Sequence, residues 1–345
     1  MKTFFTLSCI VASIALNAGI VEFKNSTIEI IHTDHRALNG ANGQDFESLN
    51  FEFLTVGNDT NQVDANGQKN GYWAEKTGGY EWRGYYVNGK KHGTFIGYPL
   101  GLPMFSFIET YDMGKKNGIF LTADRAGYIV KEQSYRNDSL DGYSRTFYTG
   151  GRLKMEEHYK NGKLDGYKRV YNASNKLSEE GFYTNGVRHG VNKWFFSDGK
   201  LNTESTYVNG KLEGVMTSYY QNGNVASKSI YKNDEIEGEY IEFHENGKIK
   251  VKGNYVNGKE QGKWMEYYDG GAVYLQGQYK NGMKDGTWTE MSEAGKKTAT
   301  VKYKDGKIAS GAYTGPHPNA KPVEAPKPAQ QPPPPGHGPG DGHNH

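Results

Sequence analysis

Hydrophobic and polar residues repeat along this chain with a period of 24 residues. A tyrosine marks each period and a glycine stands seven residues after it, as in Tyr207 and Gly214. The tyrosines that keep this step are Tyr111, Tyr135, Tyr159, Tyr183, Tyr207, Tyr231, Tyr255, Tyr279 and Tyr303. A fixed period of this size is typical of a repeat array, in which one small unit stacks on copies of itself.

Two turn signals divide each period into two short strands. Asn-Gly pairs such as Asn209-Gly210 and Asn257-Gly258 follow the tyrosine. A second glycine comes half a period later, at Gly151, Gly199, Gly223, Gly247, Gly271 and Gly295. Asparagine and glycine tolerate the positive φ of a tight turn. Each period therefore predicts one β-hairpin, and successive hairpins should pair as one antiparallel meander.

Alternation within the strands predicts two different faces. In the second strand of each period, one set of positions is aliphatic: Leu153, Leu177, Leu201, Val225, Ile249 and Val273. The positions between them are polar, as in Lys250, Lys252 and Asn254. In the first strand the most regular column is Phe147, Tyr171, Phe195, Tyr219, Phe243, Tyr267 and Met291. Because strand side chains alternate between faces, we expect an aromatic ladder on one face and charges on the other.

Small residues precede many of the repeat tyrosines by two positions. They are Gly181, Ser205, Ser229, Gly253 and Gly277. A small residue beside a ring leaves room for an aromatic side chain from the next strand to lie flat. The ladder is therefore predicted to be packed.

The phrase Tyr-x-Asn-Gly-Lys-x-x-Gly, followed by a Trp or an aromatic pair, resembles the MORN repeat in its bacterial variant form. The resemblance runs from about Asp64 to Tyr313, and the variant group includes YwqK-type antitoxin-like proteins. It implies an elongated, twisted single-layer antiparallel sheet of hairpin repeats. It also implies roles as a scaffold, a dimerisation surface, a contact to lipid head groups or a binder of a toxin protein.

The two ends of the chain differ from the repeats. Residues 1–18 contain Lys2, an apolar stretch and small residues at Ala15 and Ala18, the order of a secretory signal peptide. A buried N-terminal strand is the alternative. Residues 19–61 are predicted to cap the array with a strand near 49–56, residues 62–313 to form the repeats, and residues 314–345 to be a disordered Pro/His-rich tail. The signal predicts export to the periplasm, the cell surface or the medium.

Composition narrows the function. Only 35% of the residues are hydrophobic and the mean hydropathy is −0.81, which leaves too little for an ordinary aliphatic core of this size. The net charge of +2 is spread without a basic stripe, so no nucleic-acid partner is expected. No catalytic motif stands out, and the histidines of the tail have no imposed ligand geometry. We expect no enzyme activity, no cofactor and no metal.

The aromatic ladder is the candidate contact surface. Its predicted members are Phe195, Tyr219, Phe243, Trp264, Tyr267, Tyr268 and Trp288. Trp264 and Trp288, followed by Tyr267 and Tyr268, are the best candidates for exposed contacts. Two interpretations stay open, because the rings can form the core or can meet a partner. The leading hypothesis is an exported binding or scaffold protein that contacts another protein or a second copy of itself. The alternatives are binding of envelope glycan or lipid through the aromatic face, and neutralisation of a toxin.

Overall fold

The computed structural model describes residues 60–314, and their regular structure is all β. The strands belong to a 24-stranded antiparallel sheet, which confirms the predicted meander of hairpins. The chain divides into two compact units. The first runs up to Leu177 and includes Tyr183–Gly186, and the second holds Ser178–Phe182 and the residues from Val187 onward. Between residues 60 and 314 no helix is long and apolar enough to cross a membrane. The predicted signal peptide, cap strand and tail lie outside the described residues.

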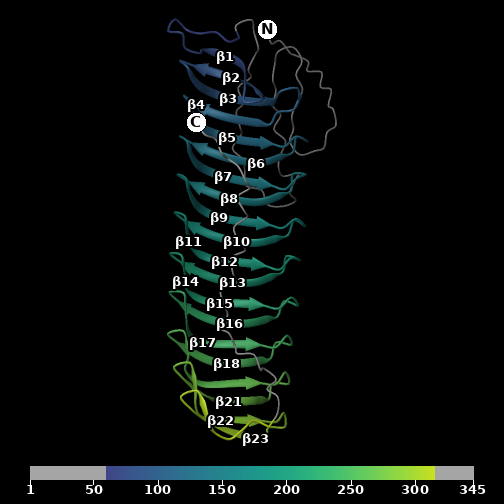
Figure 1. Ribbon diagram of the computed structural model, residues 1–345, viewed down its shortest axis with the longest axis vertical. Helices are drawn as coiled ribbons and strands as arrows, with labels where there is room; N and C mark the ends of the chain where they lie inside the picture. The colour runs from purple at the N-terminus through teal and green to yellow at the C-terminus, as the bar shows by residue number, and fades with distance from the viewer. Residues whose placement is uncertain (1–59, 315–345) are drawn as a thin grey trace, which may run out of the picture. The chain divides into compact units, whose positions relative to one another are not determined.

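The first unit contains nine strands, and each pairs with the next along the chain (Figure 1). They are β1 (Gly71–Thr77), β2 (Tyr80–Val87), β3 (Lys90–Pro99), β4 (Phe107–Asp112), β5 (Lys115–Ala123), β6 (Ile129–Arg136), β7 (Ser139–Phe147), β8 (Leu153–Lys160) and β9 (Lys163–Tyr171). The residues of β10 (Leu177–Thr184) are divided between the two units.

The second unit continues the same hairpin order. Its strands are β11 (Val187–Arg188), β12 (Gly190–Phe195), β13 (Leu201–Val208), β14 (Lys211–Leu212), β15 (Gly214–Tyr219), β16 (Val225–Lys232), β17 (Glu235–Phe243), β18 (Ile249–Val256), β19 (Lys259–Glu260), β20 (Gly262–Tyr267), β21 (Val273–Lys280), β22 (Met283–Met291), β23 (Lys297–Lys304) and β24 (Lys307–Ser310). The two-residue strands β11, β14 and β19 are separated from β12, β15 and β20 by one residue, which stands just before the repeat glycine.

Both predicted turns are present. At the Asn-Gly turns both central residues have positive φ, as at Asn209 (51°) and Gly210 (83°), which matches the type I′ hairpin. At most of the second turns one glycine carries the left-handed conformation, as at Gly223 (92°). The turn residues in the sequence therefore predict the hairpin frame correctly.

The glycine seven residues after the tyrosine produces a bulge. Ser229 pairs with Tyr240, but Tyr231 pairs with Ile236, so β17 carries two extra residues around Gly238, whose φ is 94°. Because side chains alternate with a period of two, an even shift leaves later residues on their original face. Tyr231 and Tyr240 thus lie on the same side of the sheet.

A one-residue shift follows at the other end of each hairpin. Ser218 pairs with Ser227, but Tyr219 pairs with Val225. An odd shift breaks the correspondence between the faces of the two strands. Val225 and Ser227 share one face of β16, but their partners Tyr219 and Ser218 are consecutive residues that alternate between the faces of β15. The column of Tyr219 is therefore not the packed ladder that simple alternation predicts.

Hydrogen bonds join each Asn-Gly turn to the preceding hairpin. In five repeats the side chain just before the repeat glycine accepts a bond from the backbone N–H of the turn asparagine twenty residues later, four of them in Asn-Gly turns and one in the Asn233-Asp234 turn. The pairs are Asp141 with Asn161 (3.1 Å), Asp165 with Asn185 (2.9 Å), Glu213 with Asn233 (2.9 Å), Glu237 with Asn257 (2.7 Å) and Gln261 with Asn281 (2.9 Å). These bonds fix the spacing of neighbouring turns, which is what a stack of identical units requires.

Candidate binding surface

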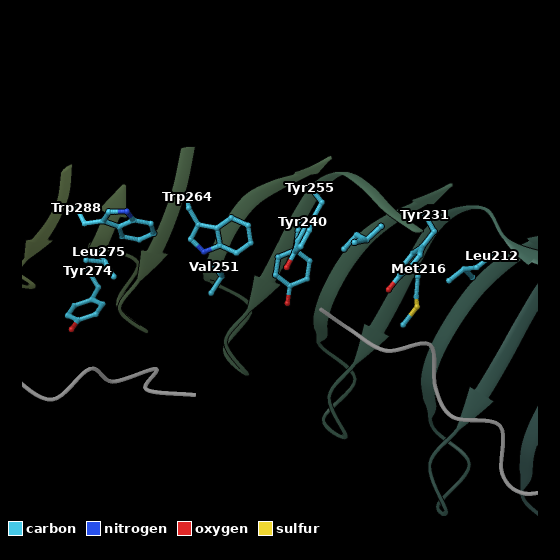
Figure 2. Close-up of a cluster of buried hydrophobic side chains, with 11 residues drawn as sticks. Leu212, Met216, Tyr231, Tyr240, Val251, Tyr255, Trp264, Tyr274, Leu275 and Trp288 are labelled. Atoms are coloured by element: carbon cyan, nitrogen blue, oxygen red, sulfur yellow. The ribbon is translucent and has the colours of Figure 1, made fainter. Parts of the chain in front are cut away.

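Aromatic rings form a packed zigzag on one face of the second unit, called here the ring face. Figure 2 shows its labelled members on the same side of the strands. The Tyr255 and Trp264 rings meet edge to face at 5.6 Å, and Trp264 meets Tyr279 at 5.3 Å. Tyr279 then meets Trp288 at 5.2 Å. Edge-to-face contacts of this kind stabilise a core beyond the area that they bury.

Glycines form the floor under two of these rings. A Cβ atom built on Gly253 would lie 1.9 Å from the Trp264 ring, and one on Gly277 would lie 2.2 Å from the Trp288 ring. Neither glycine has a positive φ, so each is needed for space and not for backbone conformation. The predicted role of the small residue before the repeat tyrosine is confirmed at these positions.

The prediction that Trp264 and Trp288 are exposed is wrong. Their side chains are 2% and 0% exposed and are the largest fully buried side chains in the described part of the chain. The physical reason is the glycine floor, which lets each indole lie against the sheet while the neighbouring tyrosines close over its edges. These two rings build the core.

The remaining predicted residues are half-buried. Phe195, Tyr219, Phe243 and Tyr267 lie outside the buried hydrophobic cluster of the second unit. Tyr268 packs against that cluster, meets Tyr274 at 5.1 Å and donates its hydroxyl to the Met291 carbonyl at 2.9 Å. The bond to Met291 joins one repeat to the next, so Tyr268 has a structural role.

Cations of the chain sit between rings at one repeated position. Five residues after the repeat tyrosine, Lys284 places its Nζ 4.1 Å from the centre of the Trp288 ring and 5.5 Å from that of Tyr303. Arg188 lies between Trp194 (5.3 Å) and Tyr207 (5.4 Å) in the same way. In the first unit Lys91 and Lys116 do the same with Phe95, Tyr111, Phe120 and Tyr135, at 4.7–5.1 Å. We call this position the cation slot.

Burial and charge act on the Lys284 ammonium in opposite directions. Burial among the rings lowers the pKa of Lys284, and the carboxylate of Glu266 offsets this only in part. The same burial raises the pKa of the ring-face tyrosines Tyr231, Tyr255 and Tyr279. The ring face is therefore a poorly hydrated environment in which charge needs a partner.

Glutamates run beside the rings as a second row. Glu242, Glu266 and Glu290 follow one another at the repeat period, and Glu266 and Glu290 are buried. Lys250 donates to Glu242 at 2.6 Å, and the backbone N–H and the hydroxyl of Thr314 donate to Glu290 at 3.0 and 2.8 Å. Buried carboxylates with such partners belong to the structure of the sheet.

The opposite face of the second unit changes character along the chain. Nine residues after each repeat tyrosine the ring face holds Asn192, Met216, Tyr240, Trp264 and Trp288, and the residues just before them, on the opposite face, are Val191, Val215, Glu239, Lys263 and Thr287. In the first two of these repeats this position of the opposite face is apolar, and in the last three it is polar. Val191, Val215 and Ile230 are 47%, 52% and 38% exposed, and Val215 pairs directly with Ile230.

In the first unit, the face opposite the rings that flank Lys91 and Lys116 is charged. Arg145 lies between Glu132 and Glu156, with nitrogen to oxygen distances of 3.6 and 2.7 Å, and Arg169 follows at 3.7 Å from Glu156. Burial acts to lower the pKa of Arg145, and the two carboxylates outweigh it, so the net pKa is raised. Glu132 and Glu156 therefore stabilise the charged form of a largely buried arginine.

Sequence reasoning missed the cation slot and the exposed valines. The sequence contains a sign of each. For the cation slot, it is that Lys91, Lys116, Arg188 and Lys284 share one position of the repeat. Val191 and Val215 stand at the position where later repeats have the polar residues Glu239, Lys263 and Thr287. A comparison of equivalent columns in every repeat would have found them.

Comparison with protein families finds the MORN repeat variant in four segments, residues 140–161, 188–209, 212–233 and 236–257. No curated protein matches the chain. Each matched segment spans a second turn and ends beside the next Asn-Gly or Asn-Asp turn. The predicted resemblance to the MORN repeat variant is confirmed over these segments. Membership of the antitoxin-like group stays a prediction.

Proposed function

We propose that this chain is a non-enzymatic, exported scaffold that binds a protein partner through the exposed apolar part of the face opposite the rings. Repeat arrays present long surfaces on which equivalent positions can vary independently of the core. Four segments are similar to the MORN repeat variant, which supports the proposal of a scaffold built from repeats.

One observation carries the proposal. Val215 and Ile230 are exposed on the paired strands β15 and β16, and Val191 is exposed on β12, which β13 separates from β15. The equivalent positions two repeats later carry Lys263, Gln278 and Glu239. Apolar side chains gathered on one exposed part of a sheet are typical of an interaction site. The ring face is less suited to this role, because its large rings are already packed against one another.

A photoreactive residue at position 215 tests the surface. The proposal expects a discrete adduct with a protein from the native source after irradiation, and a matched probe at Lys263 should give little or none. The mass of the adduct distinguishes a second copy of this chain from another protein. Equal labelling at positions 215 and 263, or no protein adduct at 215, would refute the proposal.

Glycan or lipid binding through the aromatic face and toxin neutralisation are the alternative functions. Retention of the protein on isolated cell wall or on lipid vesicles, unchanged by Val215→Asp, would favour the first. A discrete adduct with a toxin protein at position 215 would favour the second. Val208→Asp is the matched control, because Val208 is also exposed but lies beside the Asn-Gly turn.

Export rests on the order of charge, apolar stretch and small residues in positions 1–18. The mature protein is expected to begin at Leu16 or Gly19, after cleavage behind Ala15 or Ala18. Intact mass spectrometry of the protein from its native source measures this directly. A chain that keeps Lys2 in the cytoplasmic fraction would contradict export and would leave the binding surface unaffected.

A further inference from the structure

One repeat of the second unit has the rings of a cation slot but no cation of its own. In that repeat the slot position is occupied by Glu260, and the ring pair that corresponds to Trp288 and Tyr303 is Trp264 and the next repeat tyrosine, Tyr279. Glu260 pairs across the hairpin with Tyr255, as Lys284 pairs with Tyr279. The slot of Glu260 is therefore built in the same register as the slot that Lys284 fills.

The angle between the two rings is also nearly the same, although the ring pair beside Glu260 is closer. Trp264 and Tyr279 are 5.3 Å apart at 69°, and the two rings around Lys284, Trp288 and Tyr303, are 6.3 Å apart at 70°. The electron-rich faces of such rings attract a cation and oppose an anion. A carboxylate at this place is thus unfavourable unless a positive charge accompanies it.

Two polar groups in the slot have no partner within residues 60–314. Glu260 is half-buried, and its carboxylate forms no ion pair or hydrogen bond there. The hydroxyl of Tyr255 is buried and has no hydrogen-bond partner. An unpaired buried hydroxyl costs free energy, and both groups can accept a hydrogen bond from a single cation.

We infer that the Glu260 slot binds an alkylammonium group supplied from outside the repeat array, with Glu260 as its counter-ion and the Tyr255, Trp264 and Tyr279 rings as its cage. The group takes the place that Lys284 holds one repeat later. Its source is either a lysine side chain, which has N–H donors, or a quaternary amine, which has none. The inference does not depend on the proposed function, because the slot lies on the ring face and the proposed protein surface lies on the other.

Titration of the full chain with two probes tests the inference. The probes are n-butylammonium chloride and tetramethylammonium chloride. Binding is measured as the shift of the indole N–H NMR signal of Trp264, which is assigned by its loss in Trp264→Phe. Saturable shifts with a Kd on the order of millimolar are expected, and sodium chloride should not reproduce them. Binding of n-butylammonium alone identifies a lysine-type ligand, and binding of tetramethylammonium identifies a quaternary amine.

A substitution supplies the second measurement. Glu260→Lys should fill the slot internally, weaken probe binding at least tenfold and raise Tm by roughly 2–4 °C. Glu293→Lys makes the same charge change at an exposed turn residue and should leave both quantities unchanged. The inference is overturned if neither probe shows saturable binding beyond the sodium chloride control, or if Glu260→Lys fails to raise Tm above that of Glu293→Lys.

Discussion

Replacing Gly253 by alanine should destabilise the second unit through contact with one ring. The added Cβ would lie 1.9 Å from Cε3 and 2.1 Å from Cζ3 of Trp264, whereas ordinary contact begins at 3.4 Å. The indole must therefore move by roughly 1.5 Å. It cannot move freely, because Tyr240 stacks on it at 6.1 Å and Tyr255 and Tyr279 hold its edges.

The magnitude follows from three contributions. Forcing one extra carbon into a packed core costs about 1–3 kcal/mol, and each disturbed ring pair adds about 0.5–1.5 kcal/mol. Alanine also restricts the unfolded chain, which offsets about 0.4–1 kcal/mol. The net loss in the free energy of unfolding at Gly253 should be roughly 2–4 kcal/mol. Urea unfolding followed by circular dichroism measures this loss.

Two glycines of the same region serve as controls. Gly270 has no positive φ and no atom within 4 Å of a built Cβ, so Gly270→Ala should be neutral or slightly stabilising. Gly262 has φ 75° and equally open surroundings, so Gly262→Ala should cost about 1–2 kcal/mol from backbone strain alone. The three substitutions thus separate steric overlap from strain and from unfolded-state entropy.

A double-mutant cycle identifies the ring that is responsible. Gly253→Ala should cost at least about 1 kcal/mol less in a Trp264→Leu background than in the natural chain, because the overlapping ring is gone. The reasoning is refuted if Gly253→Ala behaves like Gly270→Ala, or if its cost is the same with and without the indole.

Three further predictions follow from the repeats, the charges and the buried phenols. Removal of one whole period, residues 207–230, should leave a folded array. Removal of Thr217 alone should unfold the second unit, because it moves the later side chains of its strand to the opposite face. Circular dichroism that shows a folded Thr217 deletion and an unfolded period deletion would contradict the hairpin frame. Arg145→Glu should lower the free energy of unfolding, measured by urea denaturation, by roughly 3 kcal/mol. Arg136→Glu, at an arginine whose side chain is 71% exposed, should lower it by less than about 1 kcal/mol. Similar losses would argue against a stabilising role for the ion pairs of Arg145. Burial raises the pKa of Tyr159 to about 12, so its contribution to stability is complete below pH 10 and is lost as the pH rises through 12; tyrosinate absorbance should appear together with unfolding, and ionisation near pH 10 in a folded protein would contradict this.

Much of the fold could be predicted from the sequence, because its determinants are local. The 24-residue period, the Asn-Gly turns and the second glycine each act within a few residues, so they predict the hairpins and their antiparallel order. The small residue at Gly253 and Gly277 also predicts a ring lying flat on the sheet. These features depend on backbone conformation and on side-chain size, which the sequence states directly.

Only the tertiary structure decided which columns are buried. Alternation predicts the face of a side chain only along one strand. The one-residue shift at the Tyr219–Val225 pair changes the relation between the faces of the two strands, and no turn residue in the sequence predicts that shift. The burial of Trp264 depends on the tyrosines of two neighbouring repeats, and the cation slot depends on rings up to nineteen residues from Lys284. Such contacts exist only after the hairpins have stacked. The sequence alone therefore determined the repeating frame, whereas cross-strand register and ring packing determined which of its aromatic and charged residues are available to a partner.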